Sequence, residues 1–158
     1  MIFNKKGFAI IELMIVTTII GILMTIGMLQ YQHFIIKSQV GRVISEVGEL
    51  RLSVEECINT GRMVIGTDRQ ECDPRATGSN LVVGRSQVDM PLSENLGVAQ
   101  FDNPLTSTTN IIATISQNAN PTIRSKKVIW RRNSNGFWNC LTNIEQRYIA
   151  NTCTYTVF

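Results

Sequence analysis

The sequence places one carboxylate, Glu12, inside a long apolar run, and this acid is the first residue that demands a chemical explanation. A charge in the hydrocarbon of a membrane costs roughly 2–3 kcal/mol even on lenient insertion scales, so Glu12 needs a partner. No lysine or arginine follows it until Lys37. Cleavage between Gly7 and Phe8 would create an α-amine close to Glu12. In a bundle of parallel helices, the amine of a neighbouring chain could neutralise this carboxylate, which would favour assembly.

Four cysteines form the second set of reactive side chains, and all of them follow the apolar run. Two lysines, Lys5 and Lys6, precede the run, so we expect a cytoplasmic N-terminal side. The rest of the chain would then face an oxidising compartment, in which disulfides persist. Four cysteines allow three pairings, and the residues alone do not choose among them. The cysteines are Cys57, Cys72, Cys140 and Cys153.

The sequence offers no set of residues for catalysis or metal binding. His33 is the only histidine, so no Ser/His/Asp set can be assembled without it, and we interpret it as a surface residue of a helix. The cysteines lack the C-x-x-C spacing of zinc sites, and no glycine-rich phosphate loop occurs. We therefore expect no enzymatic activity, no metal and no cofactor.

A cluster of basic residues lies in the C-terminal half. On a strand hairpin the cluster could contact DNA phosphates. We favour the alternative, a solvated strand edge whose lysines block pairing with other edges. The formal net charge of +3 makes no general case for nucleic-acid binding. The cluster consists of Arg124, Lys126, Lys127, Arg131 and Arg132.

The apolar run over residues 8–29 is the element that must position Glu12. About 22 residues at roughly 1.5 Å rise each match a hydrocarbon core of about 30 Å. The run has no small-residue cleavage site at its far end, so a signal peptide removed after its apolar region is the poorer interpretation. Because no proline occurs before Pro74, one helix can continue beyond the run.

Beyond the run, the helix is expected to become amphipathic from Ile36 and to end with Gly61 as its C′ residue. Apolar residues recur there in steps of three and four, which indicates one helical stripe. We expect the stripe to pack on the chain's own domain, because a coiled-coil surface would need a longer repeat. The stripe contains Ile36, Val40, Val43, Val47, Leu50, Val54, Cys57 and Ile58.

The remainder of the chain predicts a long loop followed by strands. Residues 61–96 are punctuated by glycine and proline. So long a loop is expected to be pinned, and a Cys57–Cys72 bond could tie it to the helix end. The strands predict an antiparallel sheet, with Trp130 and Trp138 anchoring its core rather than stacking on a ligand. The expected strands are a short one at 81–83 and four others at 97–101, 110–115, 127–132 and 137–141.

Two stretches resemble the type IV pilins. The residues Lys-Gly-Phe-Ala-Ile-Ile-Glu at 6–12 look like the prepilin leader and helix start, in which a basic leader, Gly and Phe precede an acid and a long apolar run. This likeness extends to about Gln39. The pattern Gly-x-Trp-x-Cys at 136–140, followed by a loop and Cys153, resembles the disulfide-bounded loop near the C-terminus of the family. One departure is Leu29, where pilins usually have a proline that kinks the helix.

The resemblance implies cleavage after Gly7 by prepilin peptidase, N-methylation of Phe8 and an assembly role for Glu12. It also supports one of the three cysteine pairings. We choose the local pairs, because each closes one loop and the second matches the pilin pattern. The chosen pairs are Cys57–Cys72 and Cys140–Cys153.

The implied fold class is α+β. A long N-terminal helix, with a transmembrane half and an amphipathic half, would pack on an antiparallel β-sheet of about four strands with a disulfide-bounded C-terminal loop. We expect three parts: a leader peptide over residues 1–7, a transmembrane and filament-core helix over 8–30, and a periplasmic or extracellular head over 31–158.

The implied function is that of the major structural subunit of a type IV pilus, which supports adhesion, twitching motility and DNA uptake. Its partners would be further copies of itself in a helical homopolymer, prepilin peptidase, the inner-membrane assembly machinery, and host-surface or DNA ligands. The precursor would lie in the inner membrane and the assembled pilus outside the cell. Two alternatives are a minor pilin or type II secretion pseudopilin, and a membrane-anchored binding receptor with an uncut leader.

Overall fold

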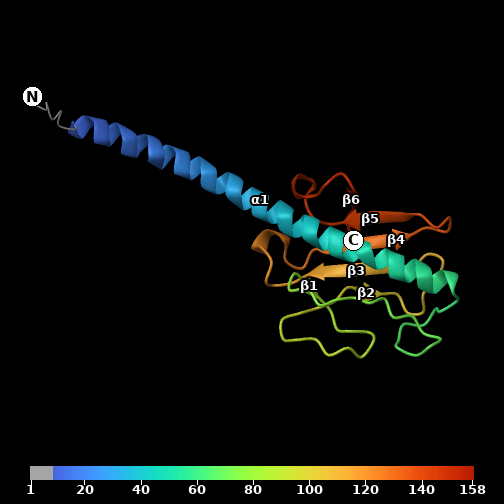
Figure 1. Cartoon of the computed structure of the whole chain (residues 1–158). Helices are drawn as coiled ribbons and strands as arrows, with labels where there is room; N and C mark the ends of the chain where they lie inside the picture. The colour runs from blue at the N-terminus through green and yellow to red at the C-terminus, as the bar shows by residue number, and fades with distance from the viewer. Residues whose placement is uncertain (1–8) are drawn as a thin grey trace, which may run out of the picture. The chain divides into compact units, whose positions relative to one another are not determined.

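The computed structural model describes residues 9–158, which form one long helix followed by a six-stranded sheet (Figure 1). By contact density the chain divides into two compact units, Met1–Ile35 and Ile36–Phe158, and the first helix contributes to both. The elements are α1 (Ile10–Asn59), β1 (Val82–Val83), β2 (Gln100–Phe101), β3 (Asn110–Ile115), the 3₁₀ helix η1 (Pro121–Ile123), β4 (Lys127–Arg132), β5 (Trp138–Thr142), the 3₁₀ helix η2 (Gln146–Tyr148) and β6 (Cys153–Tyr155).

Helix α1 ends as its sequence predicts. The N–H of Gly61 donates to the carbonyl of Ile58 at 3.1 Å, and the N–H of Arg62 donates to the carbonyl of Cys57 at 2.9 Å. These two bonds make a Schellman motif. Gly61 has a φ of +75°, which is the left-handed conformation that this C′ position requires. The prediction of Gly61 as the C′ residue is confirmed.

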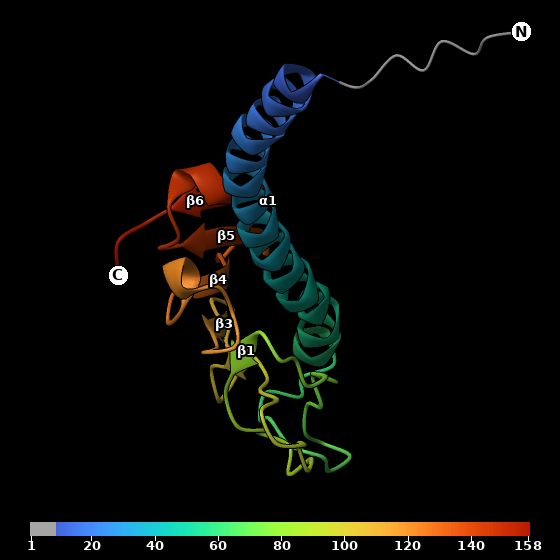
Figure 2. The same ribbon diagram turned by 90° about the vertical axis from the view of Figure 1, so that its left-hand side faces the viewer.

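The amphipathic part of α1, residues 36–59, packs on one face of the sheet (Figure 2). The expected apolar stripe is the buried one, although Leu50 and Ile58 are only partly buried. The facing sheet residues are apolar at every second position, as in Ile111, Ala113 and Ile115 of β3, because alternate strand residues point to the same side. The buried residues of α1 are Ile36, Val40, Val43, Ile44, Val47, Gly48, Val54 and Cys57.

The sheet has the order β1-β3-β4-β5-β6, with β2 also paired to β3. All pairings among β1 to β5 are antiparallel, and the four expected strands are present. Strands β1 and β6 complete the sheet. Strand β6 pairs with β5 in parallel, which makes the sheet mixed rather than purely antiparallel. The cause is the connection over residues 143–152, which includes η2 and brings the chain back so that β6 runs in the direction of β5.

Candidate functional site

The apolar segment of α1 is exposed on the isolated subunit. Over an 18-residue window its mean hydropathy is 2.3, and by length and composition this helix could cross a membrane. Large side chains remain open to solvent, for example Ile10 at 80% and Met24 at 69%. An apolar surface of this size must be covered by lipid or protein, because its contact with water is energetically unfavourable.

Glu12 lies in the first turn of α1. Its N–H donates to the carbonyl of Ala9 at 3.0 Å. A carboxylate at this end of a helix interacts favourably with the positive end of the helix dipole. Gly7 and Phe8, the predicted cleavage and methylation positions, lie outside the described residues, so Glu12 is the only part of the predicted assembly site that the structure places.

Three threonines in the apolar segment hydrogen-bond to their own helix. Thr17 and Thr18 donate to the carbonyl of Met14 at 3.0 and 2.7 Å, and Thr25 donates to that of Ile22 at 2.7 Å. These bonds satisfy the hydroxyl donors, which makes the threonines compatible with an apolar environment. Leu29, the position at which the sequence departs from the pilin pattern, lies within the helix α1.

Two disulfides are formed, Cys57–Cys72 and Cys140–Cys153, and these are the local pairs that the sequence analysis chose. The first bond joins the last turn of α1 to the following loop. This loop is also held by the N–H of Cys72, which donates to the carbonyl of Val64 at 2.7 Å. The second bond joins β5 to β6 at directly paired positions. The first disulfide therefore ties an irregular loop to α1, and the second adds a covalent bond to the pairing of β5 and β6.

Glu55 of α1 connects the helix to the β4–β5 hairpin. Its Oε1 accepts from Nε of Arg132 and from Nε1 of Trp138, both at 2.7 Å, and its Oε2 accepts from Nη2 of Arg132 at 3.3 Å. The Arg132 guanidinium, helped by the Trp138 indole, lowers the pKa of the Glu55 carboxyl against the opposing effect of burial. The ion pair is partly shielded, with side-chain exposures of 13% for Arg132 and 26% for Glu55.

Trp130 of β4 packs directly beneath α1. Its Nε1 donates to the carbonyl of Ile44 at 3.3 Å, and the guanidinium of Arg51 stacks 3.9 Å from the ring centroid. A Cβ added to Gly48 would lie 3.3 Å from Cζ2 of Trp130, so the glycine permits this close approach. The prediction that Trp130 anchors the core is confirmed, and Trp138 is partly buried against the same core.

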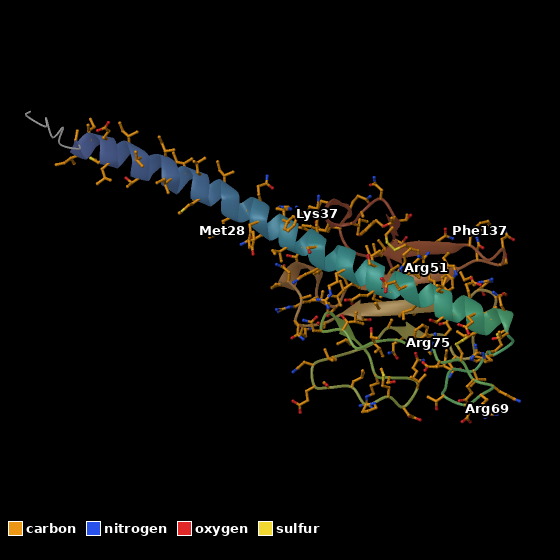
Figure 3. All side chains as sticks on the ribbon, viewed as in Figure 1. Met28, Lys37, Arg51, Arg69, Arg75 and Phe137 are labelled. Carbon is orange, nitrogen blue, oxygen red and sulfur yellow. A yellow bond between two sulfur atoms is a disulfide. The ribbon has the colours of Figure 1, made fainter. Side chains whose placement is uncertain are left out.

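A groove of about 700 Å³ opens beside these tryptophans, between α1 and the β5–β6 region. Leu52 forms an exposed wall, with 81% of its surface accessible. Arg51, one of the lining residues on α1, is labelled in Figure 3. The predictions from sequence did not include the groove, although Gly48 in the middle of an apolar stripe is a signal of close packing. Its lining residues are Ile44, Ser45, Gly48, Glu49, Arg51, Leu52, Glu55, Trp130, Trp138 and Thr152.

The structure divides the predicted basic cluster between two sides of the sheet. Arg132 points toward α1 and pairs with Glu55, whereas Arg131 donates to Oδ1 of Asn110 at 2.9 Å. Arg124, outside the strands, donates to the carbonyl of Ala119 at 3.0 Å. The cluster is therefore not one continuous basic surface. Within residues 9–158, no group of three or more His, Cys, Asp or Glu side chains is placed to hold a metal ion.

Comparison with known proteins gives matches along nearly the whole chain. A family described as "Pilin (bacterial filament)" matches residues 36–154, and the "Prokaryotic N-terminal methylation motif" matches residues 2–28. A "Probable minor fimbrial protein" of Dichelobacter nodosus is 47% identical over 153 residues, which is 96% of each chain. The "Type IV major fimbrial protein FimA" of the same organism is 36% identical over 154 residues, 94% of this chain and 96% of the relative.

A more distant match is a "Fimbrial protein" of Pseudomonas aeruginosa. It is 31% identical over 139 residues, which cover 86% of this chain and 84% of the relative. The family match over residues 36–154 includes strands β1 to β5 and both disulfides. The similarity thus extends to the two ends that carry the sequence motifs and to the middle of the chain.

Proposed function

This chain belongs to the pilin family of bacterial filament proteins, and on that premise we propose that it is a structural subunit that assembles into a type IV pilus. The observation that carries the proposal is the exposed apolar segment of α1 with Glu12 in its first turn, ahead of a disulfide-bonded head. In a filament, copies of this segment would cover one another inside a bundle. The test is to shear surface filaments from the native strain and identify this chain in them by mass spectrometry.

We further propose that residues 1–7 are a leader, that residues 8–30 cross the membrane and later form the filament core, and that residues 31–158 form the head. The methylation-motif match over residues 2–28 supports processing at this end. Prepilin peptidase would cut after Gly7, and Phe8 would carry one methyl group. N-terminal sequencing of filament subunits tests this boundary, because an uncut chain would begin at Met1.

The proposed assembly step pairs Glu12 of one subunit with the Phe8 amine of the next. Before assembly the precursor would lie in the inner membrane with its head in the periplasm. Within the filament, the low dielectric around the helices would strengthen the attraction between the two charges. The proposed partners are therefore further copies of the chain, the membrane and the assembly machinery.

The chain could be the major or a minor subunit of the filament, and these two roles differ in how abundant the chain is in the filament. The resemblance of the sequence to type IV pilins favours a major subunit. The relative called a probable minor fimbrial protein is more similar to this chain than the major fimbrial protein FimA, at 47% against 36% identity, which favours a minor subunit. Quantitative mass spectrometry of sheared filaments distinguishes the two: a major subunit dominates the protein content, whereas a minor one is a small fraction.

Adhesion, twitching motility and DNA uptake are proposed as activities of the assembled filament rather than of the isolated chain. Two basic side chains of β4, Lys127 and Arg131, are exposed, which supports contact with an anionic ligand. For DNA, the affinity should fall steeply with salt because binding releases counterions from the phosphates. Filament binding to labelled duplex DNA at increasing salt tests this activity, and salt-independent retention would argue against it.

A further inference from the structure

The tryptophan groove of the head, as lined above, has an apolar floor and an accessible acid at its rim. Leu52 is 81% exposed, and Glu49, one helical turn away, lies on the same face of α1. The other charges of the groove are already engaged, since Glu55 pairs with Arg132 and Arg51 stacks on Trp130. Glu49 has no ion pair within the described part of the chain. The groove therefore suits an occupant with an apolar side chain and a cation.

The β4–β5 turn of the same head presents such a pair of side chains. Phe137 is 69% exposed, and Figure 3 shows it at the end of the hairpin. Its backbone is fixed because Oδ1 of Asn133 accepts from the N–H groups of Asn135 at 3.0 Å and of Phe137 at 2.8 Å. The N–H of Asn133 in turn donates to the carbonyl of Phe137 at 2.8 Å. An aromatic side chain on a rigid turn loses little conformational entropy when it binds.

Arg131 provides the cation beside Phe137. It is directly paired with Asn139, which places it diagonally across the hairpin from Phe137, at a separation of roughly 7–8 Å between backbones. Arg131 is exposed and has no ion pair among residues 9–158. Trp138, the first residue of β5, bonds to Glu55 on the α1 side, so the alternation of side chains along the extended chain directs the preceding Phe137 away from α1. The groove and the turn therefore lie on different faces of the head.

The two surfaces are also complementary in charge. Glu46, Glu55 and Glu56 of α1 are neutralised by arginines of the same chain, which leaves Glu49 as the exposed, unpaired acid of the groove among residues 9–158. On the hairpin, Arg131 is exposed and likewise has no ion pair there. Opposite charges on two surfaces favour encounter and suppress the pairing of like surfaces. Because the surfaces differ and belong to the same chain, a contact between them can repeat from copy to copy, and a repeat whose rotation does not close into a ring builds a filament.

We propose that Phe137 of one copy docks into the tryptophan groove of a second copy, with Arg131 next to Glu49. The proposal rests on the proposed function, since it requires neighbouring copies in a filament. It assigns a contact between the heads of neighbouring copies, made by two different surfaces, in addition to the packing of the apolar helices. Phe137 is the aromatic anchor of the contact, and the wall formed by Leu52 excludes water around it.

Cysteine cross-linking between two differently tagged copies tests the contact in intact filaments. One copy carries Leu52→Cys and the other Phe137→Cys, and a short bismaleimide reagent is added after shearing. We expect a cross-linked dimer containing both tags, and no such dimer when Leu52→Cys is combined with Tyr155→Cys, an exposed control at 47% accessibility. Filaments that contain both tagged copies but give no mixed dimer would overturn the proposal, as would a cross-link only to a different protein.

Charge reversal provides a second test that does not need a new cysteine. Glu49→Arg and Arg131→Glu should each lower the yield of sheared filaments at least tenfold, because each places like charges together, and the double variant should restore most of it. Glu94→Arg is the matched control, because it reverses the charge of an exposed residue that does not line the groove. A double variant no better than the single ones, with normal subunit levels in the membrane, would overturn the proposal. Absence of the wild-type chain from filaments would instead refute the proposed function.

Discussion

Replacing Glu55 by glutamine should loosen the head where α1 meets the β4–β5 hairpin. The carboxylate accepts three hydrogen bonds, two from Arg132 and one from Trp138, at 2.7 to 3.3 Å. A glutamine keeps one acceptor oxygen but presents an amide NH₂ where the second oxygen stood. That NH₂ would face a donor of the guanidinium or the indole, so at least one of these donors loses its partner.

The expected loss of stability can be worked out from the type of these hydrogen bonds and from the solvent exposure of the residues that form them. A hydrogen bond to a charged group contributes roughly 1.5–3 kcal/mol, and a solvent-exposed ion pair contributes roughly 0–1 kcal/mol. The pair of Glu55 and Arg132 lies between these limits, with side-chain exposures of 26% and 13%. We therefore expect Glu55→Gln to lower the free energy of unfolding by about 1–2 kcal/mol. For a domain of this size the melting temperature should fall by about 3–10 °C.

The measurement is thermal unfolding of the full-length subunit in detergent, with disulfides intact, followed by circular dichroism. Glu49→Gln is the matched control, because Glu49 is exposed and should change stability by less than about 0.5 kcal/mol. The pKa of Glu55 is lowered in the folded head, so its stabilising effect is present above the pKa of the unfolded chain and is lost as the pH falls through the folded-state value. The difference between wild type and Glu55→Gln should therefore disappear in acid. Equal melting temperatures at neutral pH, or a difference that grows in acid, would refute this reasoning.

Three other predictions can each be tested by a separate measurement. Gly48→Ala should lower the free energy of unfolding by about 1–2 kcal/mol relative to Gly41→Ala. The reason is that the new Cβ at Gly48 lies 3.3 Å from Trp130, whereas a Cβ at Gly41 has no neighbour within 4 Å. Equal melting temperatures of the two variants would contradict the close packing. Non-reducing peptide mapping should find only the two disulfides described above, and a peptide joining Cys57 to Cys140 would refute them. Glu12→Ala should spare membrane insertion but reduce pilus yield, because loss of one member of a buried charge pair costs about 3–5 kcal/mol; normal piliation would exclude an assembly role.

Much of the fold could be predicted because local signals agree with the final structure. Strands β3 and β4 occupy the predicted residues, since β-branched runs there are bounded by turn residues on both sides. The end of α1 at Gly61 follows from the same kind of local rule. The buried face of α1 follows from helical periodicity, to which the structure adds Ile44 and Gly48. Each of these features depends on residues close together in the chain.

The features that escaped prediction depend on long-range pairing. Strand β6 has only three residues and gains its place by pairing in parallel with β5, which no local pattern indicates. The groove joins Gly48 and Leu52 of α1 to tryptophans more than seventy residues away. Glu55 lies off the apolar stripe and reads locally as a solvated charge, yet it binds Arg132 and Trp138. Hydrogen bonds between distant segments need the folded sheet before they can be recognised.

Mass spectrometry of subunits from sheared surface filaments tests the central claim most directly. If this chain is a processed filament subunit, the filaments should contain a form that begins at Phe8 and carries one added methyl group. Detection in filaments of a form that begins at Met1 would contradict the proposed processing. Purified filaments that lack this chain altogether, although it is present in the membrane, would contradict the claim that it is a filament subunit.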